Sequence, residues 1–196
     1  MTGGHELKNE VISLNTKKAL AASLKKIMQQ KPFSKITISE IIRDCGLNRN
    51  TFYYHFEDIY ALLHWMFEEE AIDVVKHFDL LFDYKDAIRF IVGYIEANNH
   101  IISCAYDSIG HDELKRFFYH DFIGIVSSVI DRAEQESAER LEPEFKAFIA
   151  QFYTEAISGT LVDWLKNNRV TTREKMIEYL CVVIENGLRQ FHIPAD

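Results

Sequence analysis

Residues 37–58 read TISEIIRDCGLNRNTFYYHFED, and this stretch decides the fold. Thr37 and Glu40 have the spacing of a capping box, in which a Thr hydroxyl and a Glu carboxylate satisfy the first free amides of a helix. Gly46 can adopt the left-handed conformation that ends this helix. Asn48 can then cap another helix, from Arg49 to Phe56. A helix, a glycine turn and a second helix within about 20 residues predict a helix-turn-helix.

The rest of the chain also predicts helices and no strand. Asn15 or Thr16 can cap a first helix that ends before Pro32, with Leu20 and Leu24 on its apolar stripe. Further helices are expected over Asp58–Phe78, Asp86–Glu96, Asn99–Asp107, Asp112–Ala138, Pro143–Asn168 and Thr172–Phe191, with a loop over residues 78–84. We therefore expect an all-α protein of about nine helices: a flexible tail (1–12), a three-helix domain (13–57) and a larger helical domain (58–196).

Composition and charge narrow the class of protein. Hydrophobic residues make up 47% of the 196 residues, which is enough for a real core. The net charge is −8, but residues 1–60 carry nine basic and six acidic residues, so the N-terminal segment is weakly basic and can face phosphates. Three widely spaced cysteines predict no disulfide, and no apolar run reaches the roughly 18 residues of a membrane span. We expect a cytoplasmic protein.

Residues 37–58 resemble the DNA-binding signature of TetR-type (TetR/AcrR) transcriptional regulators, above all in the run Thr51-Phe-Tyr-Tyr-His-Phe56. Residues 159–165, GTLVDWL, are similar to a subgroup that includes activators of dihydroxyacetone kinase operons. The resemblance implies a homodimer that binds a palindromic operator in double-stranded DNA, and a ligand-sensing and dimerisation domain over residues 58–196. Repression is favoured over activation, with operator affinity controlled by a small effector or a protein partner of unknown identity.

The second helix of the motif should enter the major groove, with its N-terminal residues at the base edges. Arg can bind guanine and Asn can bind adenine through paired hydrogen bonds, while lysines and helix N-termini hold phosphates. The expected DNA contacts are Lys35, Thr37, Arg43, Asn48, Arg49, Asn50, Thr51, Tyr53, Tyr54 and His55. Many relatives have a lysine at the start of the next helix, where this chain has Glu57, Asp58 and Ile59, and these acids would repel DNA.

The last two helices are more apolar than one internal face requires, and pairing with their copies in a dimer would bury them as a four-helix bundle. The expected interface residues are Phe148, Phe152, Ala156, Thr160, Trp164, Leu180, Ile184 and Leu188. The resemblance places a ligand pocket among the middle helices, with Trp65, Phe78, Tyr94, Tyr106, Phe118 and Phe122 as candidate lining residues.

Two other functions compete with this interpretation. An enzyme would need a catalytic motif such as GxSxG, HExxH, a P-loop or a dinucleotide glycine motif, and the sequence has none. His100 and Cys104 are four residues apart, but they belong to no compact ligand set, so we expect neither a metal nor a cofactor. An adaptor or co-activator that keeps the fold and binds DNA only with a partner is the main alternative, because a lysine is absent at Ile59 and the body is acidic.

Overall fold

The computed structural model describes residues 3–137, 140–167 and 171–189, and within these ranges all regular structure is helical. The chain divides into two compact units, Met1–Glu69 and Glu70–Asp196. The all-α prediction is confirmed, and no β-strand occurs in the described ranges. The helix ends that we expected at Ala138, Asn168 and Phe191 lie outside the described residues.

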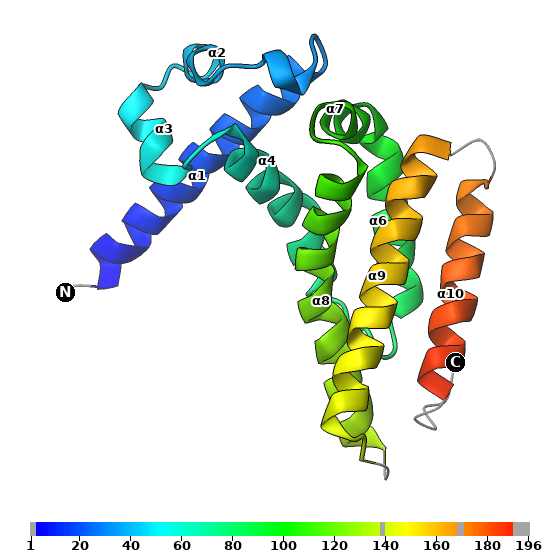
Figure 1. The fold of residues 1–196 in the computed structure, drawn as a ribbon. Coiled ribbons are helices and arrows are strands. Elements are labelled where there is room, and N and C mark those ends of the chain that lie inside the picture. Colours follow the sequence, from blue (N-terminus) through cyan, green and yellow to red (C-terminus); the bar gives the residue numbers. More distant parts are fainter. Residues whose placement is uncertain (1–2, 138–139, 168–170, 190–196) are drawn as a thin grey trace. The chain divides into compact units, whose positions relative to one another are not determined.

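The first unit is built on the long helix α1, against which α2, α3 and α4 pack (Figure 1). Its elements are α1 (Gly3–Met28), a 3-10 turn (Phe33–Lys35), α2 (Ile38–Asp44), α3 (Arg49–His55) and α4 (Ile59–Phe67). Leu20, Leu24, Ile41, Phe52 and Leu62 are fully buried and form the core. Burying each of these side chains contributes roughly 1.5–3 kcal/mol, which holds three short helices that would not be stable alone.

The ends of the short helices are fixed by side chains that the sequence places there. Thr37 and Glu40 form the predicted capping box: the Thr37 amide and hydroxyl both donate to the Glu40 carboxylate, at 3.0 and 2.8 Å. Gly46 has φ of +69°, the left-handed conformation expected for the turn. The Asn48 side chain accepts a hydrogen bond from the Thr51 amide at 2.9 Å. These local bonds set the angle between α2 and α3.

Three boundaries differ from the sequence predictions. Helix α1 begins at Gly3, so residues 3–12 are helical rather than a loose tail; once a helix is nucleated, extending it by a residue costs little. The first unit extends to Glu69 rather than ending at residue 57. The single helix expected over Asp58–Phe78 is divided into α4, a π-helical segment (Glu68–Ile72) and a short α5 (Asp73–Val75).

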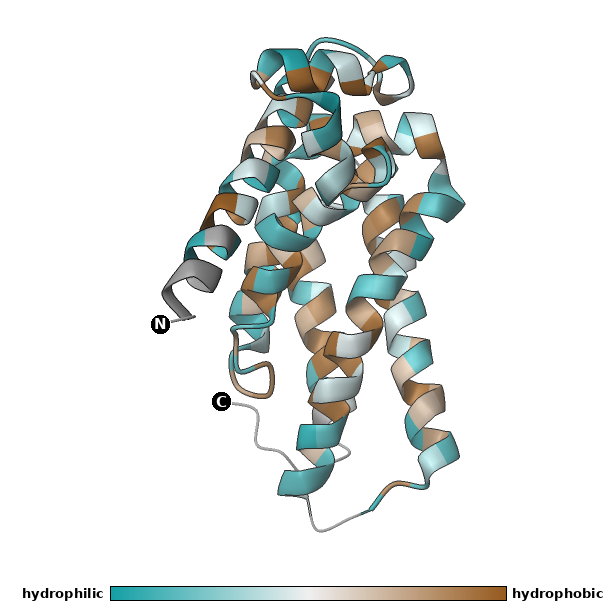
Figure 2. Ribbon diagram, turned by 90° about the vertical axis from the view of Figure 1, so that its left-hand side faces the viewer, coloured by the Kyte–Doolittle hydropathy of each residue, from teal (hydrophilic) through white to brown (hydrophobic). Residues whose placement is uncertain are grey.

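The second unit is a bundle in which α8 pairs with α9 and α10 pairs with α6 (Figure 1). Its helices are α6 (Tyr84–Ala97), α7 (Asn99–Ile109), α8 (His111–Glu136), α9 (Pro143–Asn167) and α10 (Arg173–Arg189). Pro143 is the first residue of α9, where its missing amide hydrogen is not needed. Figure 2 shows apolar residues recurring along the whole length of these helices.

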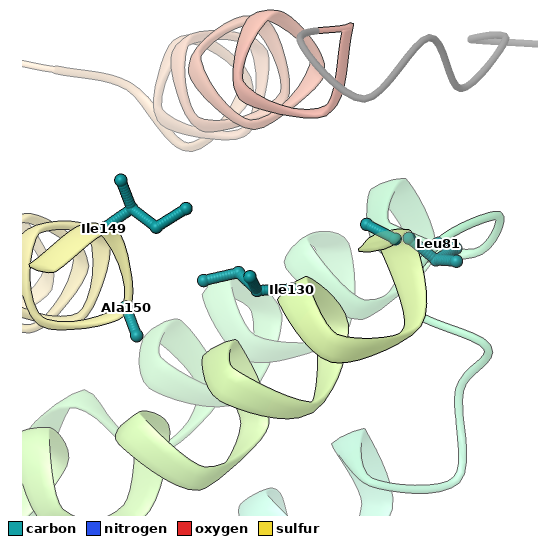
Figure 3. Packing of buried hydrophobic residues seen from close by; sticks show 5 residues of the cluster. Leu81, Ile130, Ile149 and Ala150 are labelled. Carbon is teal, nitrogen blue, oxygen red and sulfur yellow. The ribbon is translucent and has the colours of Figure 1, made fainter. Parts of the chain in front are cut away.

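One end of this bundle is closed by a cluster of buried apolar residues, shown in Figure 3. Ile130 of α8 and Ile149 of α9 point toward each other, and Leu81 lies at the side of the cluster. Ala150 and Ala133 complete it, and their small side chains allow α8 and α9 to approach closely. The cluster packs α8 against α9, and Ile130 and Ile149 also line the space between these helices and α10.

Candidate functional site

Helix α3 has one face buried in the first unit and one face exposed to solvent. Phe52 and Phe56 are buried in the core of the first unit. Tyr53 is 49% exposed and Tyr54 is 82% exposed, so both side chains, which we listed among the expected DNA contacts, are accessible to solvent. Arg49, at the N-terminal end of the helix, is also exposed. The buried phenylalanines therefore fix which side of α3 meets solvent.

The exposed side chains of α3 are ordered by contacts with one another. The Arg49 guanidinium lies 5.8 Å from the centre of the Tyr53 ring, a cation–π geometry. Tyr54 meets the His55 ring edge to face, with 4.9 Å between the ring centres. Burial, with the charge of nearby Lys17, lowers the pKa of His55, so its imidazole is neutral at pH 7 and one ring nitrogen can accept a hydrogen bond. These two ring contacts order the side chains along the exposed side of α3.

The remaining predicted DNA contacts lie in the same unit and differ in their exposure and in their hydrogen bonds. Lys35, Arg43, Asn48 and Asn50 are exposed, and Thr51 is half-buried. Thr37 is exposed too, but its hydroxyl is engaged with Glu40 in the capping box. Both the amide and the hydroxyl of Thr37 are therefore occupied within the capping box.

The capping box carries a fixed negative charge. Hydrogen bonds from Lys31 and Thr37 lower the pKa of Glu40 to about 2. The Lys31 ammonium lies 2.5 Å from the Glu40 carboxylate, which places a cation beside it. Glu40 is consequently ionised at any pH at which the protein would be used, and its charge is neutralised locally.

Two lysines of α1, Lys17 and Lys26, make contacts within the first unit. The Lys17 ammonium lies 5.9 Å from the centre of the Phe56 ring and 5.6 Å from that of Trp65. Lys26 forms an ion pair with Asp44 at 2.5 Å. Trp65, which we had expected to line a ligand pocket, packs instead against Phe56 in the first unit, with ring centres 5.8 Å apart.

Asp58 explains the acidic start of α4. Its carboxylate accepts a hydrogen bond from the Ala61 amide at 2.8 Å, so it is the N-cap of that helix. Capping residues of this kind stabilise a helix by about 1 kcal/mol. Asp58 therefore has a structural role as the cap of α4.

The second unit contains an apolar cavity of about 160 Å³ between α6, α8, α9 and α10, which is partly open to solvent. Each of the four helices contributes to its wall: α6 through Ala87, α8 through Ile125, α9 through Ile157 and α10 through Ile184. The full lining comprises Val75, Leu80, Tyr84, Ala87, Ile88, Ile91, Val92, Phe122, Ile125, Val126, Val129, Ile130, Ile149, Tyr153, Ile157, Leu161, Leu180, Ile184 and Gly187. Close-packed interiors have few voids larger than a water molecule, so this one is a feature to be explained.

Of the six pocket residues predicted from the sequence, only Phe122 lines this cavity. Phe118 stacks on Phe122 with 5.8 Å between ring centres but lies outside the wall. Phe78 and Tyr94 both pack against Phe90, and the Tyr94 hydroxyl donates to Glu70 at 2.9 Å. Tyr106 lies beneath the Lys166 ammonium. We had favoured aromatic residues, whereas the cavity wall consists mostly of isoleucine, valine and leucine.

Helix α9 presents an apolar stripe to solvent. Phe148 and Phe152, four residues apart, are 59% and 58% exposed, and Ala156 and Thr160 continue the stripe. These four predicted interface residues lie on one face. Trp164 does not: it is buried, and its indole N–H donates to the Thr171 carbonyl at 2.9 Å. Trp164 is therefore an internal residue of the second unit.

Helix α10 is apolar on two sides, and the sequence prediction selected the inner one. Leu180 and Ile184 line the cavity. Tyr179, Val182 and Val183 are exposed and form the outer face. The side chain of Leu188 lies outside the described residues. The spacing of residues 179, 182 and 183 was the signal for this outer stripe.

Two other features, a metal site and a membrane-spanning helix, are absent from the described residues. These residues contain no group of three or more His, Cys, Asp or Glu side chains that could hold a metal ion. No described helix is long and apolar enough to cross a membrane.

A helix-turn-helix head with an outward-facing α3, joined to a separate helical unit, is the architecture of a helix-turn-helix transcription regulator. The model of the bacterial regulatory proteins of the tetR family matches residues 20–66, and that of a transcriptional regulator C-terminal region matches residues 83–186, more than half of the chain. This chain belongs to the TetR family of transcriptional regulators.

The chain is similar to the HTH-type dhaKLM operon transcriptional activator DhaS of Lactococcus lactis subsp. lactis (strain IL1403), with 23% identity over 145 residues, 74% of this chain and 76% of that protein. A solved structure of a dihydroxyacetone kinase operon activator DhaS aligns with a TM-score of 0.65 and 22% identity, over 92% of this chain and 98% of the other.

Two further solved structures have the same fold. NalD, the secondary repressor of the MexAB-OprM multidrug efflux pump in Pseudomonas aeruginosa, aligns with a TM-score of 0.57 and 21% identity, covering 89% of this chain and 97% of NalD. A TetR transcriptional regulator from Streptococcus agalactiae aligns with a TM-score of 0.55 and 24% identity, covering 91% and 98%.

Proposed function

We propose that this protein binds a palindromic DNA operator as a homodimer and that a small molecule in the second unit controls its operator affinity. The observation that carries the DNA-binding part is the outward face of α3. Arg49, Tyr53 and Tyr54 are exposed there while Phe52 anchors the helix. Arg and Asn at the N-terminal end of such a helix can discriminate bases, each well-formed pair of hydrogen bonds contributing roughly 1–3 kcal/mol.

The homodimer is supported by the exposed apolar faces of α9 and α10. A monomer would leave Phe148 and Phe152 of α9 and Val182 and Val183 of α10 exposed to water, and exposed apolar side chains gathered on helix faces are typical of interfaces. Two copies related by a two-fold axis bury the same face on each partner. Such a dimer can present two recognition helices about 34–36 Å apart, one turn of the duplex.

Ligand control is supported by the cavity in the second unit. Unfilled apolar space costs roughly 24 cal/mol per Å³ where it is fully enclosed, so about 4 kcal/mol is the upper limit for this partly open cavity of 160 Å³. A molecule that fills the cavity recovers part of this energy in whichever conformation encloses it. If the two conformations differ in operator affinity, the ligand shifts the population between them.

Repression is the direction of regulation that we propose, and activation is the second candidate. Activation is favoured by the similarity to DhaS, which is named a transcriptional activator. NalD, with the same fold, is named a repressor. A reporter gene behind the selected operator tests the direction: deleting the protein should raise expression if it represses and lower it if it activates.

The DNA-binding proposal is tested by selecting duplexes from a random pool with the purified protein at two salt concentrations. A palindrome should be enriched, and its binding should fall steeply with salt because phosphate contacts release counterions. Arg49→Ala or Tyr54→Ala should weaken binding roughly 10- to 100-fold. Arg116→Ala, which alters an exposed arginine on α8, is the matched control and should have no effect. If no sequence is enriched, DNA binding by this protein alone is contradicted, and the adaptor function is favoured.

The dimer is tested by light scattering. Phe152→Asp on α9 and Val183→Asp on α10 should each give monomers, because a charge in the buried centre of an interface is strongly unfavourable. Phe82→Asp replaces an equally exposed apolar residue outside these two helices and should leave the dimer intact. A dimer in both interface variants would show that the protomers associate elsewhere.

A further inference from the structure

We infer that the molecule held by the cavity is small, uncharged and almost wholly apolar, about the size of one six-membered ring. A polyhydroxylated, phosphorylated or carboxylated effector is therefore excluded from this cavity. The inference rests on the proposed ligand control and adds the chemical class of the effector to it.

The chemistry of the wall carries this conclusion. Among the described residues that line the cavity, none has a charged side chain, and only Tyr84 and Tyr153 carry a polar side-chain atom. The Tyr153 hydroxyl packs against α10 so closely that a Cβ on Gly187 would collide with it. The helical backbone around the cavity satisfies its own amides and carbonyls. Hydrogen-bonding groups on a ligand would thus find almost no partners.

The cost of an unmatched polar group decides which ligands fit. A hydroxyl that leaves water without gaining a hydrogen-bond partner weakens binding by roughly tenfold or more. A ligand with three hydroxyls, such as glycerol, incurs this cost three times. A phosphate or carboxylate would also need a cation, and none lines the wall. An apolar ligand loses no hydrogen bond on entering and gains dispersion contacts with the wall.

The volume sets the size of the ligand. Another protein with an engineered apolar cavity of about 150 Å³ keeps it dry and binds benzene there. The present cavity, about 160 Å³, has that size and that kind of wall, and it differs in being partly open to solvent. Because residues 149, 153, 157 and 161 of α9 all contribute, the space follows the helix axis, which suits a flat ring or a short branched chain.

The test uses the full-length protein with toluene as the apolar probe and with glycerol and inorganic phosphate as polar probes. At a hundred times its dissociation constant, toluene should raise Tm by about 5–10 °C. Isotope-labelled isoleucine methyl groups should shift at positions 125, 149 and 184 in the wall and not at Ile12 of α1. Ala87→Leu, which fills the cavity from α6, should abolish both effects. Ala97→Leu makes the same change at an exposed position of α6 and should preserve them.

The outcomes separate this inference from the proposed function. Binding of glycerol or phosphate at the wall residues, or no response to toluene, would overturn the inference. Toluene binding that Ala87→Leu does not alter would place the ligand elsewhere and would also overturn it. Toluene binding in the cavity with unchanged operator affinity would support the ligand class and refute the proposed ligand control of DNA binding.

Discussion

Replacing Ala87 by leucine should stabilise the protein, which is uncommon for a change at a buried site. The Ala87 side chain is buried and forms part of the wall of the 160 Å³ cavity. Leucine adds three carbon groups, each contributing about 0.8 kcal/mol when buried, so the upper limit of the gain is about 2.4 kcal/mol. Side-chain ordering offsets up to about 1 kcal/mol of this. We expect a net gain of about 1.5 kcal/mol and a rise in Tm of about 3–6 °C.

Urea unfolding at one fixed protein concentration measures the effect, because the stability of a dimer depends on concentration. Ala97→Leu at the exposed end of α6 should change the free energy of unfolding by less than about 0.5 kcal/mol. In a fully packed site the added carbons would instead force strain and destabilise the protein by about 1–3 kcal/mol. A loss of that size for Ala87→Leu would refute the cavity and the reasoning built on it.

Three other substitutions test the packing and electrostatics. In the wild-type protein, the lowered pKa of Glu40 contributes stability that is present above pH 4.5 and is lost as the pH falls toward 2. Glu40→Gln should therefore make the free energy of unfolding depend less on pH across that interval. An equal dependence on pH in the variant and the wild type would contradict this. Gly187→Ala gains about 1 kcal/mol of helix propensity, but the collision with the Tyr153 hydroxyl should make it net destabilising by about 1 kcal/mol, with partial rescue by Tyr153→Phe in a double-mutant cycle. Trp164→Phe should cost about 1 kcal/mol by thermal unfolding and leave the dimer intact, since it removes an internal hydrogen bond; a monomer would return Trp164 to the interface.

The helix-turn-helix could be predicted from the sequence because its determinants are local. Thr37 with Glu40, Gly46 and Asn48 act on amides and torsions within a few residues, so their spacing is sufficient. Asp58 was expected to begin the next helix, where an acid suits the helix N-terminus although it would repel DNA. Its role as a helix cap was equally local and could have been predicted from the same rule.

The faces of the long helices could not be assigned from the sequence, because the choice depends on partners far away in the chain. Helix α10 has one apolar stripe through Leu180 and Ile184 and another through Val182 and Val183. Periodicity shows that both stripes exist and gives no means of telling which one meets α6. The cavity was missed for a related reason: an underfilled space depends on the sum of side-chain volumes on four helices, and no single residue signals it.

The cavity and the outer face of α10 lie on different sides of one helix, so the two are mechanically linked. Leu180 and Ile184 face the cavity, while Tyr179 and Val183 face the proposed partner subunit. A ligand that displaces Ile184 outward moves Val183 with it, because neighbouring residues of a helix move together. Filling the cavity from Ala87 should therefore imitate the ligand. An Ala87→Leu dimer is expected to have the operator affinity of the ligand-bound state and no further response to toluene, and anisotropy titrations with and without toluene would measure both.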